Sequence, residues 1–355
     1  MWSRRGLGRV CASALLTAGL PAVKAQTPTA AVNAPPLVRA PLGRVVVAVD
    51  HKASFCYLPL TIAERLGYFA AEGLDVLVRD FSEPGQALQA VLTGAAHVVS
   101  GPYSHTIGLQ LRGQQLRSFV LQGRTPQLVL GVSQQTMGGF RQLRELRGRR
   151  VAVTSLGSAS HRIARLLLGR AGLGPQDVHF QVFAHATATE AAFRSGQVDA
   201  LCYHDPLITQ LEQSGELRVV ADTRTMRGNA EVFGGPLPAG SLCASSGFVG
   251  EHPRQCQAMA SALVRALKWL QTAGPSDLNK TVPESYFEGD RSLYLAAFSR
   301  ARESWVPDGL MPENGPQTVV RMLSQFGDAP QLQRVDLART FTNEFARVAK
   351  ARFRA

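Results

Sequence analysis

The stretch LPLTIAERLGYFAAEGLDVLVRDF, from Leu58 to Phe81, contains both kinds of element from which the fold is predicted. Its first half has apolar residues at helical spacing and runs to Gly67, a residue type that often ends helices in a left-handed conformation. Gly73 then reverses the chain, and Leu74 to Val78 has the length and composition of a buried strand. The stretch therefore predicts a helix–strand unit of an α/β sheet.

Strand-length apolar runs and amphipathic stretches alternate on both sides of this unit. One series extends from RVVVAVD, starting at Arg44, to LRSFVLQG, and a second extends from RRVAVTS, starting at Arg149, to LRVVADT. Such alternation predicts, for each series, a mostly parallel sheet with right-handed crossovers and helices on both faces. After Pro253 the pattern becomes entirely helical.

This order predicts an α/β protein with two Rossmann-like lobes, a ligand cleft between them and a helical C-terminal segment. Lobe 1 is expected to be discontinuous, over 44–130 and 245–355, and lobe 2 to span 131–244. The runs QLVLGVSQQ and SLCASSGFVGE are both extended, and either could carry the chain between the lobes. Ligands of open α/β sheets bind at the carboxyl ends of strands, and here two such edges would face each other.

The first 25 residues have the pattern of an export signal. A basic stretch precedes a short apolar run, and small residues before Gln26 predict cleavage after about Ala25. The alternative is an amphipathic organellar presequence, which is disfavoured because the arginines precede the apolar run. Sec and twin-arginine export both stay open. Residues 26–43, rich in Pro, Ala and Thr, predict a flexible leader, and the mature chain is expected to be periplasmic.

Charge and cysteine usage narrow the function further. The formal net charge is +12, and four of the basic residues lie in the export signal, so 12 minus 4 leaves +8 on the mature chain. Because the arginines are scattered and the chain is exported, a nucleic-acid partner is not expected. The cysteines have no C-x-x-C spacing, which gives no support for a zinc or redox motif. A bond between Cys243 and Cys256 stays open.

Four motifs in their order carry a resemblance to a known family: YLPLTIAERLGYFAAEGLDV, GPYSHTIGLQLRGQQL, LRELRGRRVAVTSLGS and AAFRSGQVDALCYHDP. Over roughly 44–270 the chain resembles the substrate-binding proteins of ABC importers for nitrate, sulfonate, taurine and thiamine-pyrimidine precursors, which have the type II periplasmic binding protein fold. The resemblance implies a monomeric solute receptor that delivers a small ligand to an ABC permease in the inner membrane. It implies no cofactor.

Positions just after strands supply the candidate ligand contacts in lobe 1. Ser54 and Tyr57 follow the first strand, and Gly85 follows the second, where backbone can approach a ligand closely. Tyr103 and His105 follow the third strand, and together they could form a stacking and hydrogen-bonding wall for a planar ligand. The alternative for each is structural: capping, core packing, or a histidine satisfied by backbone.

In lobe 2 the loop TSLGSASH is the sharpest candidate. It lies between a strand and a helix, where free N–H groups and the helix dipole favour an anion. Its candidate contacts are Ser155, Ser158, Ala159 and Ser160, although Ser158 could simply cap the helix. The remaining candidates are His185, Tyr203 and Asp205.

Two candidates have open alternatives. Asp205 precedes Pro206 and could either cap a helix or bind an amine or ring nitrogen. Arg124 could clamp a carboxylate or sulfonate, or could be a surface arginine near the hinge.

An enzyme is the alternative class. A pyrimidine synthase that shares this fold consumes its own histidine with the help of iron, so His105, His185 and His204 keep an exported enzyme open. The chain has no H-E-x-x-H pair, no G-x-S-x-G turn and no phosphate loop, which favours a receptor. The Ser-rich loop favours an anionic group and the tyrosines favour a flat ring. A small aromatic or heterocyclic acid, or a pyrimidine-like compound, is therefore expected first, and an aliphatic sulfonate second.

Overall fold

A computed structural model describes residues 42–326 and 329–355. The predicted export signal and the first part of the predicted leader lie outside these residues. Within them, no helix combines the length and the apolar character needed to cross a membrane.

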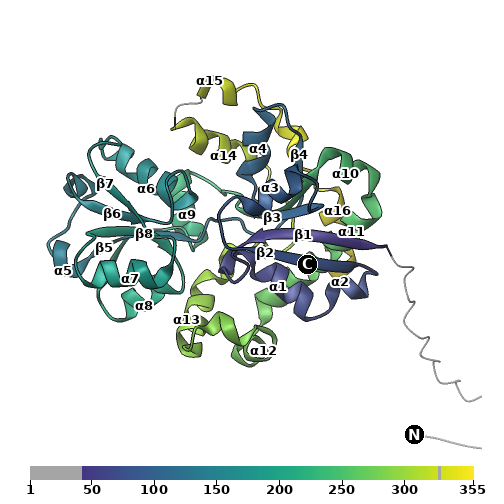
Figure 1. Cartoon of the computed structure of the whole chain (residues 1–355), viewed down its shortest axis with the longest axis horizontal. Helices are drawn as coiled ribbons and strands as arrows, with labels where there is room; N and C mark the ends of the chain where they lie inside the picture. The colour runs from purple at the N-terminus through teal and green to yellow at the C-terminus, as the bar shows by residue number, and fades with distance from the viewer. Residues whose placement is uncertain (1–41, 327–328) are drawn as a thin grey trace, which may run out of the picture. The chain divides into compact units, whose positions relative to one another are not determined.

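The first lobe is built around a five-stranded sheet of order β2-β1-β3-β10-β4. All its strands run parallel except β10, which lies antiparallel between β3 and β4. Figure 1 shows α1 and α2 on one side of the β1–β2 pair and α3 on the other. The strands are β1 (Arg44–Asp50), β2 (Asp75–Phe81), β3 (Val98–Pro102), β4 (Leu116–Leu121) and β10 (Gly240–Ser245).

The second lobe is built around a second five-stranded sheet, of order β7-β6-β8-β5-β9. Here β5 is the reversed strand, antiparallel to both β8 and β9. In each sheet the reversed strand is the first one that the chain forms after it arrives from the other lobe. Each sheet is therefore mostly parallel, with one antiparallel strand. The strands are β5 (Leu128–Ser133), β6 (Arg150–Val153), β7 (His179–Val182), β8 (Ala200–His204) and β9 (Leu217–Asp222).

The strands also place the crossings between the sheets. Strand β5 pairs along its whole length within the second sheet, and β10 pairs along its whole length within the first. The chain therefore crosses in 122–127 and in 223–239, and not at the predicted boundaries 130/131 and 244/245. The two extended runs that were expected to offer a crossing form strands β5 and β10 instead. Sequence could not separate the two roles, because a buried crossing strand and a central sheet strand are equally apolar.

The stretch that decided the fold forms two helices and a strand. Helix α1 (Leu58–Arg65) stops before Gly67, whose φ of +67° is left-handed, and α2 (Tyr68–Ala71) follows it. Gly73 has φ +80°, and β2 begins two residues later. Gly67 thus ends the first helix, as expected, and a second short helix precedes the turn at Gly73.

The remaining helices cover the sheets or form the C-terminal part. Beside the first sheet lie α3 (Gln86–Leu92) and α4 (Ser104–Gln110), together with the short 3-10 turn Phe55–Tyr57. The second lobe contains α5 (Gln134–Met137), α6 (Ala159–Arg170), α7 (Ala186–Arg194), α8 (Leu207–Gln213) and α9 (Met226–Phe233), of which α9 lies in the second crossing segment. Helix α9 was not predicted.

The chain after β10 is helical, as predicted from Pro253 onward. Near its end a 3-10 turn at Leu337–Arg339 precedes a helix that begins at Glu344. This part contains α10 (Ser246–Glu251), α11 (Pro253–Thr272), α12 (Pro275–Thr281), α13 (Arg291–Ala301), α14 (Gly315–Ser324), α15 (Ala329–Leu332) and α16 (Glu344–Phe353).

Helix α11 is the central helix of the first lobe. It packs against α1, α2 and α16, and eleven of its residues are buried. Trp305, fully buried beside this core, donates its indole N–H to the carbonyl of Phe55 at 3.0 Å. That bond fixes the turn between β1 and α1, where two of the predicted ligand contacts lie.

Candidate ligand site

The carboxyl end of β1 is organised by Asp50. Its carboxylate accepts hydrogen bonds from the backbone N–H groups of Gly85 and Ala87, each at 2.8 Å. Gly85 has φ +88°, and no atom lies within 4 Å of the position that a Cβ would take. The Asp50 carboxylate therefore occupies the N–H of Gly85 at the start of α3. A ligand contact through the other atoms of Gly85 stays a prediction.

Ser54 and Tyr57 flank the short turn after β1. Both are half-buried, and the Ser54 side chain forms no capping bond to the turn. Burial, with the nearby Cys56 and Asp50, raises the pKa of the Tyr57 phenol well above its ordinary value. Tyr57 is therefore a neutral hydrogen-bonding group at any physiological pH. Lys52, in contrast, is paired with Glu64 of α1.

The two residues after β3 have different environments. Tyr103 is fully buried, and its hydroxyl lies 2.6 Å from Oγ1 of Thr340. It packs the core and does not form the predicted wall, because the fourth residue of GPYSHT begins α4 and turns the tyrosine side chain inward. The core-packing alternative holds for Tyr103.

His105 is half-buried, and its Nδ1 is buried without a hydrogen-bond partner among the described residues. The ring lies over Gly101, where an added Cβ would stand 3.6 Å from Nδ1. Burial lowers the pKa of His105 to about 4; the negative charge of Asp50 opposes that shift and the positive charge of Arg162 adds to it. His105 is thus a neutral imidazole with an unused nitrogen.

The loop between β6 and α6 is held by its own hydroxyl groups. Ser158 donates to the carbonyl of Ser155 at 2.7 Å and accepts from the N–H of His161 at 3.3 Å, which makes it the N-cap of α6. The hydroxyls of Thr154, Ser158 and Ser160 lie within 2.9 to 3.1 Å of one another. The capping alternative therefore holds for Ser158, and Ser160 is buried beside it.

The outer surface of this loop stays open. Ser155 is half-buried, Ala159 is exposed, and the Leu156 side chain keeps 66% of its surface accessible. The first N–H groups of a helix have no partner within the helix, so the start of α6 can donate to an anion.

Arg162, which the sequence reading missed, lies in the first turn of α6. It is half-buried, burial lowers its pKa, and among the described residues it forms no ion pair or hydrogen bond through its side chain. Its charge acts on His105 of the first lobe. Arg162 follows the loop TSLGSASH by one residue, so its position at a helix start was the signal that could have identified it.

The candidates at the end of β8 and at the start of α7 differ in burial. Tyr203 is buried, donates to the carbonyl of Ala184 at 3.3 Å and stacks on His204 with the ring centroids 4.6 Å apart. Burial lowers the pKa of His204; Asp205 and Glu288 oppose this shift, and His51 adds to it. His185, the N-cap residue of α7, is exposed.

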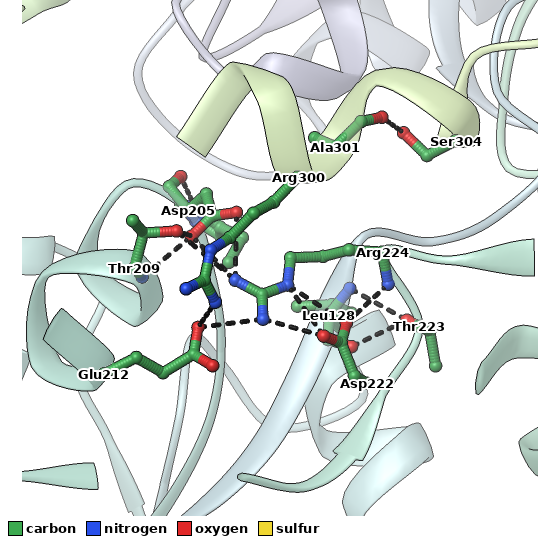
Figure 2. Close-up of polar contacts among 11 residues, drawn as sticks. Leu128, Asp205, Thr209, Glu212, Asp222, Thr223, Arg224, Arg300, Ala301 and Ser304 are labelled. Carbon is green, nitrogen blue, oxygen red and sulfur yellow. Dashed lines mark hydrogen bonds and ion pairs between the residues drawn. The ribbon is translucent and has the colours of Figure 1, made fainter. Parts of the chain in front are cut away.

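The Asp205 carboxylate belongs to a buried ion cluster (Figure 2). It is 5% exposed and accepts from the N–H and the hydroxyl of Thr209, at 2.9 and 2.8 Å, at the start of α8. Arg224 donates to both of its oxygens at 3.3 Å. The helix-capping alternative therefore holds for Asp205, whose carboxylate caps α8 and neutralises a buried arginine.

Arg224 is the centre of that cluster, which we call the Arg224 cluster: Arg224, Asp205, Asp222 and Glu212. Arg224 is 1% exposed and lies 2.7 Å from Asp222 and 2.9 Å from Glu212. Burial alone would lower the pKa of the guanidinium, but the three carboxylates raise it above its ordinary value. The cluster fixes β8, α8 and β9 to one another.

Arg124 is half-buried in the crossing segment, and its side chain donates to the carbonyl of Glu303 at 2.8 Å, so one of its N–H groups has a structural partner. All four cysteines of the described chain are free thiols, so Cys243 and Cys256 do not pair. Within the described residues no group of three or more His, Cys, Asp or Glu side chains is arranged to hold a metal ion.

Comparison with known proteins agrees with this architecture. The family model described as NMT1/THI5 like matches residues 55–274. A solved structure from Bordetella bronchiseptica RB50 is 42% identical, with a TM-score of 0.80, and the match covers 88% of this chain and 98% of that one.

Two more distant structures share the fold. The alkanesulfonate-binding protein SsuA from Xanthomonas axonopodis pv. citri, bound to MOPS, is 20% identical with a TM-score of 0.64, over 86% of this chain and 99% of that one. The periplasmic nitrate-binding protein NrtA from Synechocystis PCC 6803 is 13% identical with a TM-score of 0.65, over 88% and 90% of the two chains.

Proposed function

The chain belongs to the NMT1/THI5-like family, and from that premise we propose that it is an extracytoplasmic solute receptor of an ABC importer. The fold it shares with sulfonate-binding and nitrate-binding periplasmic proteins supports this role. The N-terminal export pattern supports a periplasmic location. The partner would be a membrane permease that accepts the loaded receptor.

The observation that carries the proposal is the free guanidinium of Arg162. A half-buried arginine without an acidic partner has lost much of its hydration and gained no counter-charge, so an anion is its natural complement. Arginine also presents a planar fork that matches a carboxylate or a sulfonate. The ligand is therefore a small organic anion.

Other candidate contacts describe the rest of the ligand. His105 offers an unused imidazole nitrogen and Tyr57 a neutral phenol, which suit a polar ring or chain attached to the anionic group. The N–H groups at the start of α6 offer donors, and the exposed Leu156 offers an apolar contact. We retain as contacts Ser54, Tyr57, Gly85, His105, Ser155, Ala159 and His185, and we add Arg162. Tyr103, Ser158, Ser160, Tyr203 and Asp205 support the site from inside the lobes.

Capture follows from closure of the lobes on the ligand. Arg162 belongs to the second lobe and His105 to the first, so an anion held by both stabilises the arrangement in which they are close. A ligand shifts such an equilibrium only by the difference in its affinity for the two states. The receptor therefore needs no cofactor and no covalent step.

The test is ligand-induced thermal stabilisation of residues 26–355 with aliphatic sulfonates, aromatic carboxylates, pyrimidines and nitrate. Wild type is compared with Arg162→Gln and with the control Arg227→Gln, whose side chain is 90% exposed. We expect a saturating shift for an organic anion in wild type and in the control. Loss of a charge-assisted contact of about 1.5–3 kcal/mol should weaken binding roughly 10- to 100-fold in Arg162→Gln. Saturation only by uncharged pyrimidines, or equal binding by Arg162→Gln, would overturn the proposal.

A further inference from the structure

A second cavity lies along the C-terminal half of α6. Its volume is about 340 Å³, within the range of small-molecule sites. Its walls come from α6, from the loop that leads to β7, and from the chain just after α14, more than 140 residues later. We call it the α6 groove; the residues used below are Arg165, Arg170, Leu173, Val178, Phe180 and Phe326.

The walls of the α6 groove are apolar and basic. Leucine, valine and phenylalanine side chains form half of the lining, two arginines stand among them, and none of the described lining residues is acidic. Among the described residues neither Arg165 nor Arg170 forms an ion pair. The described lining of the groove is therefore positively charged.

The Arg165 guanidinium lies over the ring of Phe326. Its guanidinium carbon lies 5.2 Å from the centroid of Phe326, and the side chain is half-buried. A guanidinium stacked on an aromatic face keeps its N–H groups in the plane, where they can meet an oxyanion. The same ring that orients the arginine also adds apolar surface for the rest of a ligand.

We propose that the α6 groove binds an amphipathic organic anion, with its carboxylate or sulfonate on Arg165 and Arg170 and its apolar part against Leu173, Val178 and Phe180. The occupant carries a single anionic head, since the two arginines are the only charged groups among the described residues of the lining. This site is separate from the proposed ligand site at the start of α6. It links α6 of the second lobe to the chain after α14, so its occupancy favours the lobe arrangement in which Phe326 covers Arg165.

The probe is 1-anilinonaphthalene-8-sulfonate, an amphipathic anion whose fluorescence rises in apolar sites, titrated against the folded full-length mature chain. Wild type is compared with Arg165→Gln, with Arg170→Gln and with the control Arg254→Gln. Arg254 also lines an apolar surface groove, in that case beside Leu42, Phe345 and Val348. We expect the dissociation constant to rise at least about tenfold in Arg165→Gln, several-fold in Arg170→Gln and less than twofold in the control.

Competition separates the sources of such a ligand. Decanoate represents a lipid-derived acid and 2-naphthoate a soluble aromatic acid; displacement by either supports the site, and the stronger competitor identifies the source. Decanol, which lacks the charge, is expected to displace poorly. Equal displacement by decanol, or unchanged probe binding in Arg165→Gln, would overturn the proposal. Loss of probe binding in Arg162→Gln but not in Arg165→Gln would assign the probe to the other site, and would also overturn it.

Discussion

The guanidinium of Arg300 lies 2.5 Å from the carboxylate of Glu212, although 88 positions separate the two residues. Arg300 is on α13 and Glu212 is on α8, so this ion pair joins the C-terminal helical part to the second lobe (Figure 2). Glu212 also accepts from Arg224 at 2.9 Å. The contact between these two parts of the chain is thereby tied to the buried Arg224 cluster.

Removing this pair should loosen the contact without unfolding either part. The Arg300 side chain is 42% exposed, so we expect Arg300→Gln to lower the free energy of unfolding by only about 0.5–1 kcal/mol. If ligand capture uses this lobe arrangement, the dissociation constant should rise about two- to fivefold by calorimetry.

The control is Arg291→Gln, which removes an arginine of similar exposure that pairs with Glu284 inside the C-terminal part. It should leave ligand affinity unchanged. Equal effects of the two substitutions on affinity would mean that the Arg300–Glu212 pair does not influence the lobe arrangement.

Arg224 should be among the most sensitive positions for stability. Arg224→Met leaves Asp205 and Asp222 without their buried counter-charge, which should cost about 3–5 kcal/mol of unfolding free energy. Denaturant titration measures the loss. The exposed pair of Arg227 with Glu231 supplies the comparison, and Arg227→Gln should cost less than about 0.5 kcal/mol. A loss below 1 kcal/mol for Arg224→Met would contradict the structural role assigned to the cluster.

His105 should make the unliganded protein sensitive to acid. Its pKa is lowered from 6.5 to about 4 in the folded state, so the unfolded chain binds more protons between these values. Stability is therefore fully present above about pH 6.5, falls as the pH drops towards 4, and changes no further below it. The linkage limit is about 3 kcal/mol, and the partial exposure of the ring reduces it. Unfolding titrations at several pH values, with His105→Gln as the comparison, should show a smaller fall in the variant.

Ligand binding should have the opposite pH dependence. An anion beside His105 favours the imidazolium, so the complex binds more protons than the free protein and the affinity for a sulfonate should rise as the pH falls from 7 to 5. Sulfonates stay ionised over this range, so the titrating group belongs to the protein, and His105, whose pKa is lowered by burial, is the group that an anion beside Arg162 would affect. Calorimetry with wild type and His105→Gln tests this; a slope that is the same in both proteins would exclude His105 as the source.

Gly228 and Gly250 form a matched pair of helical glycines. A Cβ on Gly228, in α9, would stand 1.8 Å from the carbonyl oxygen of Asp222, whereas a Cβ on Gly250, in α10, meets no atom within 4 Å. Gly228→Ala should therefore lower the free energy of unfolding by about 3 kcal/mol or more, since a backbone oxygen cannot easily move. Gly250→Ala should raise it by about 0.5–1 kcal/mol through helix propensity. Similar denaturation midpoints for the two variants would contradict this packing.

Much of the fold could be predicted from local sequence alone. The alternation from Arg44 onward, the glycines at 67 and 73 and the Ser158 helix cap depend on interactions within a few residues, and each is found where it was expected. The reversed strands β5 and β10 could not be predicted, because the same apolar sequence suits a parallel or an antiparallel neighbour.

The candidate site depended on tertiary structure for a different reason. Position after a strand selected Tyr103, Tyr203 and Asp205 correctly as residues at the edge of a sheet, but only packing decided that their polar atoms point inward, towards Thr340, Ala184 and Arg224. Arg162 is a candidate contact because its guanidinium has no counter-charge among the described residues and because its charge acts on His105, 57 positions earlier. The sequence by itself determined which segments become strands and helices, since those choices are local. Tertiary structure decided which side chains are satisfied and which remain free for a ligand, because burial and charge pairing depend on residues far apart in the chain.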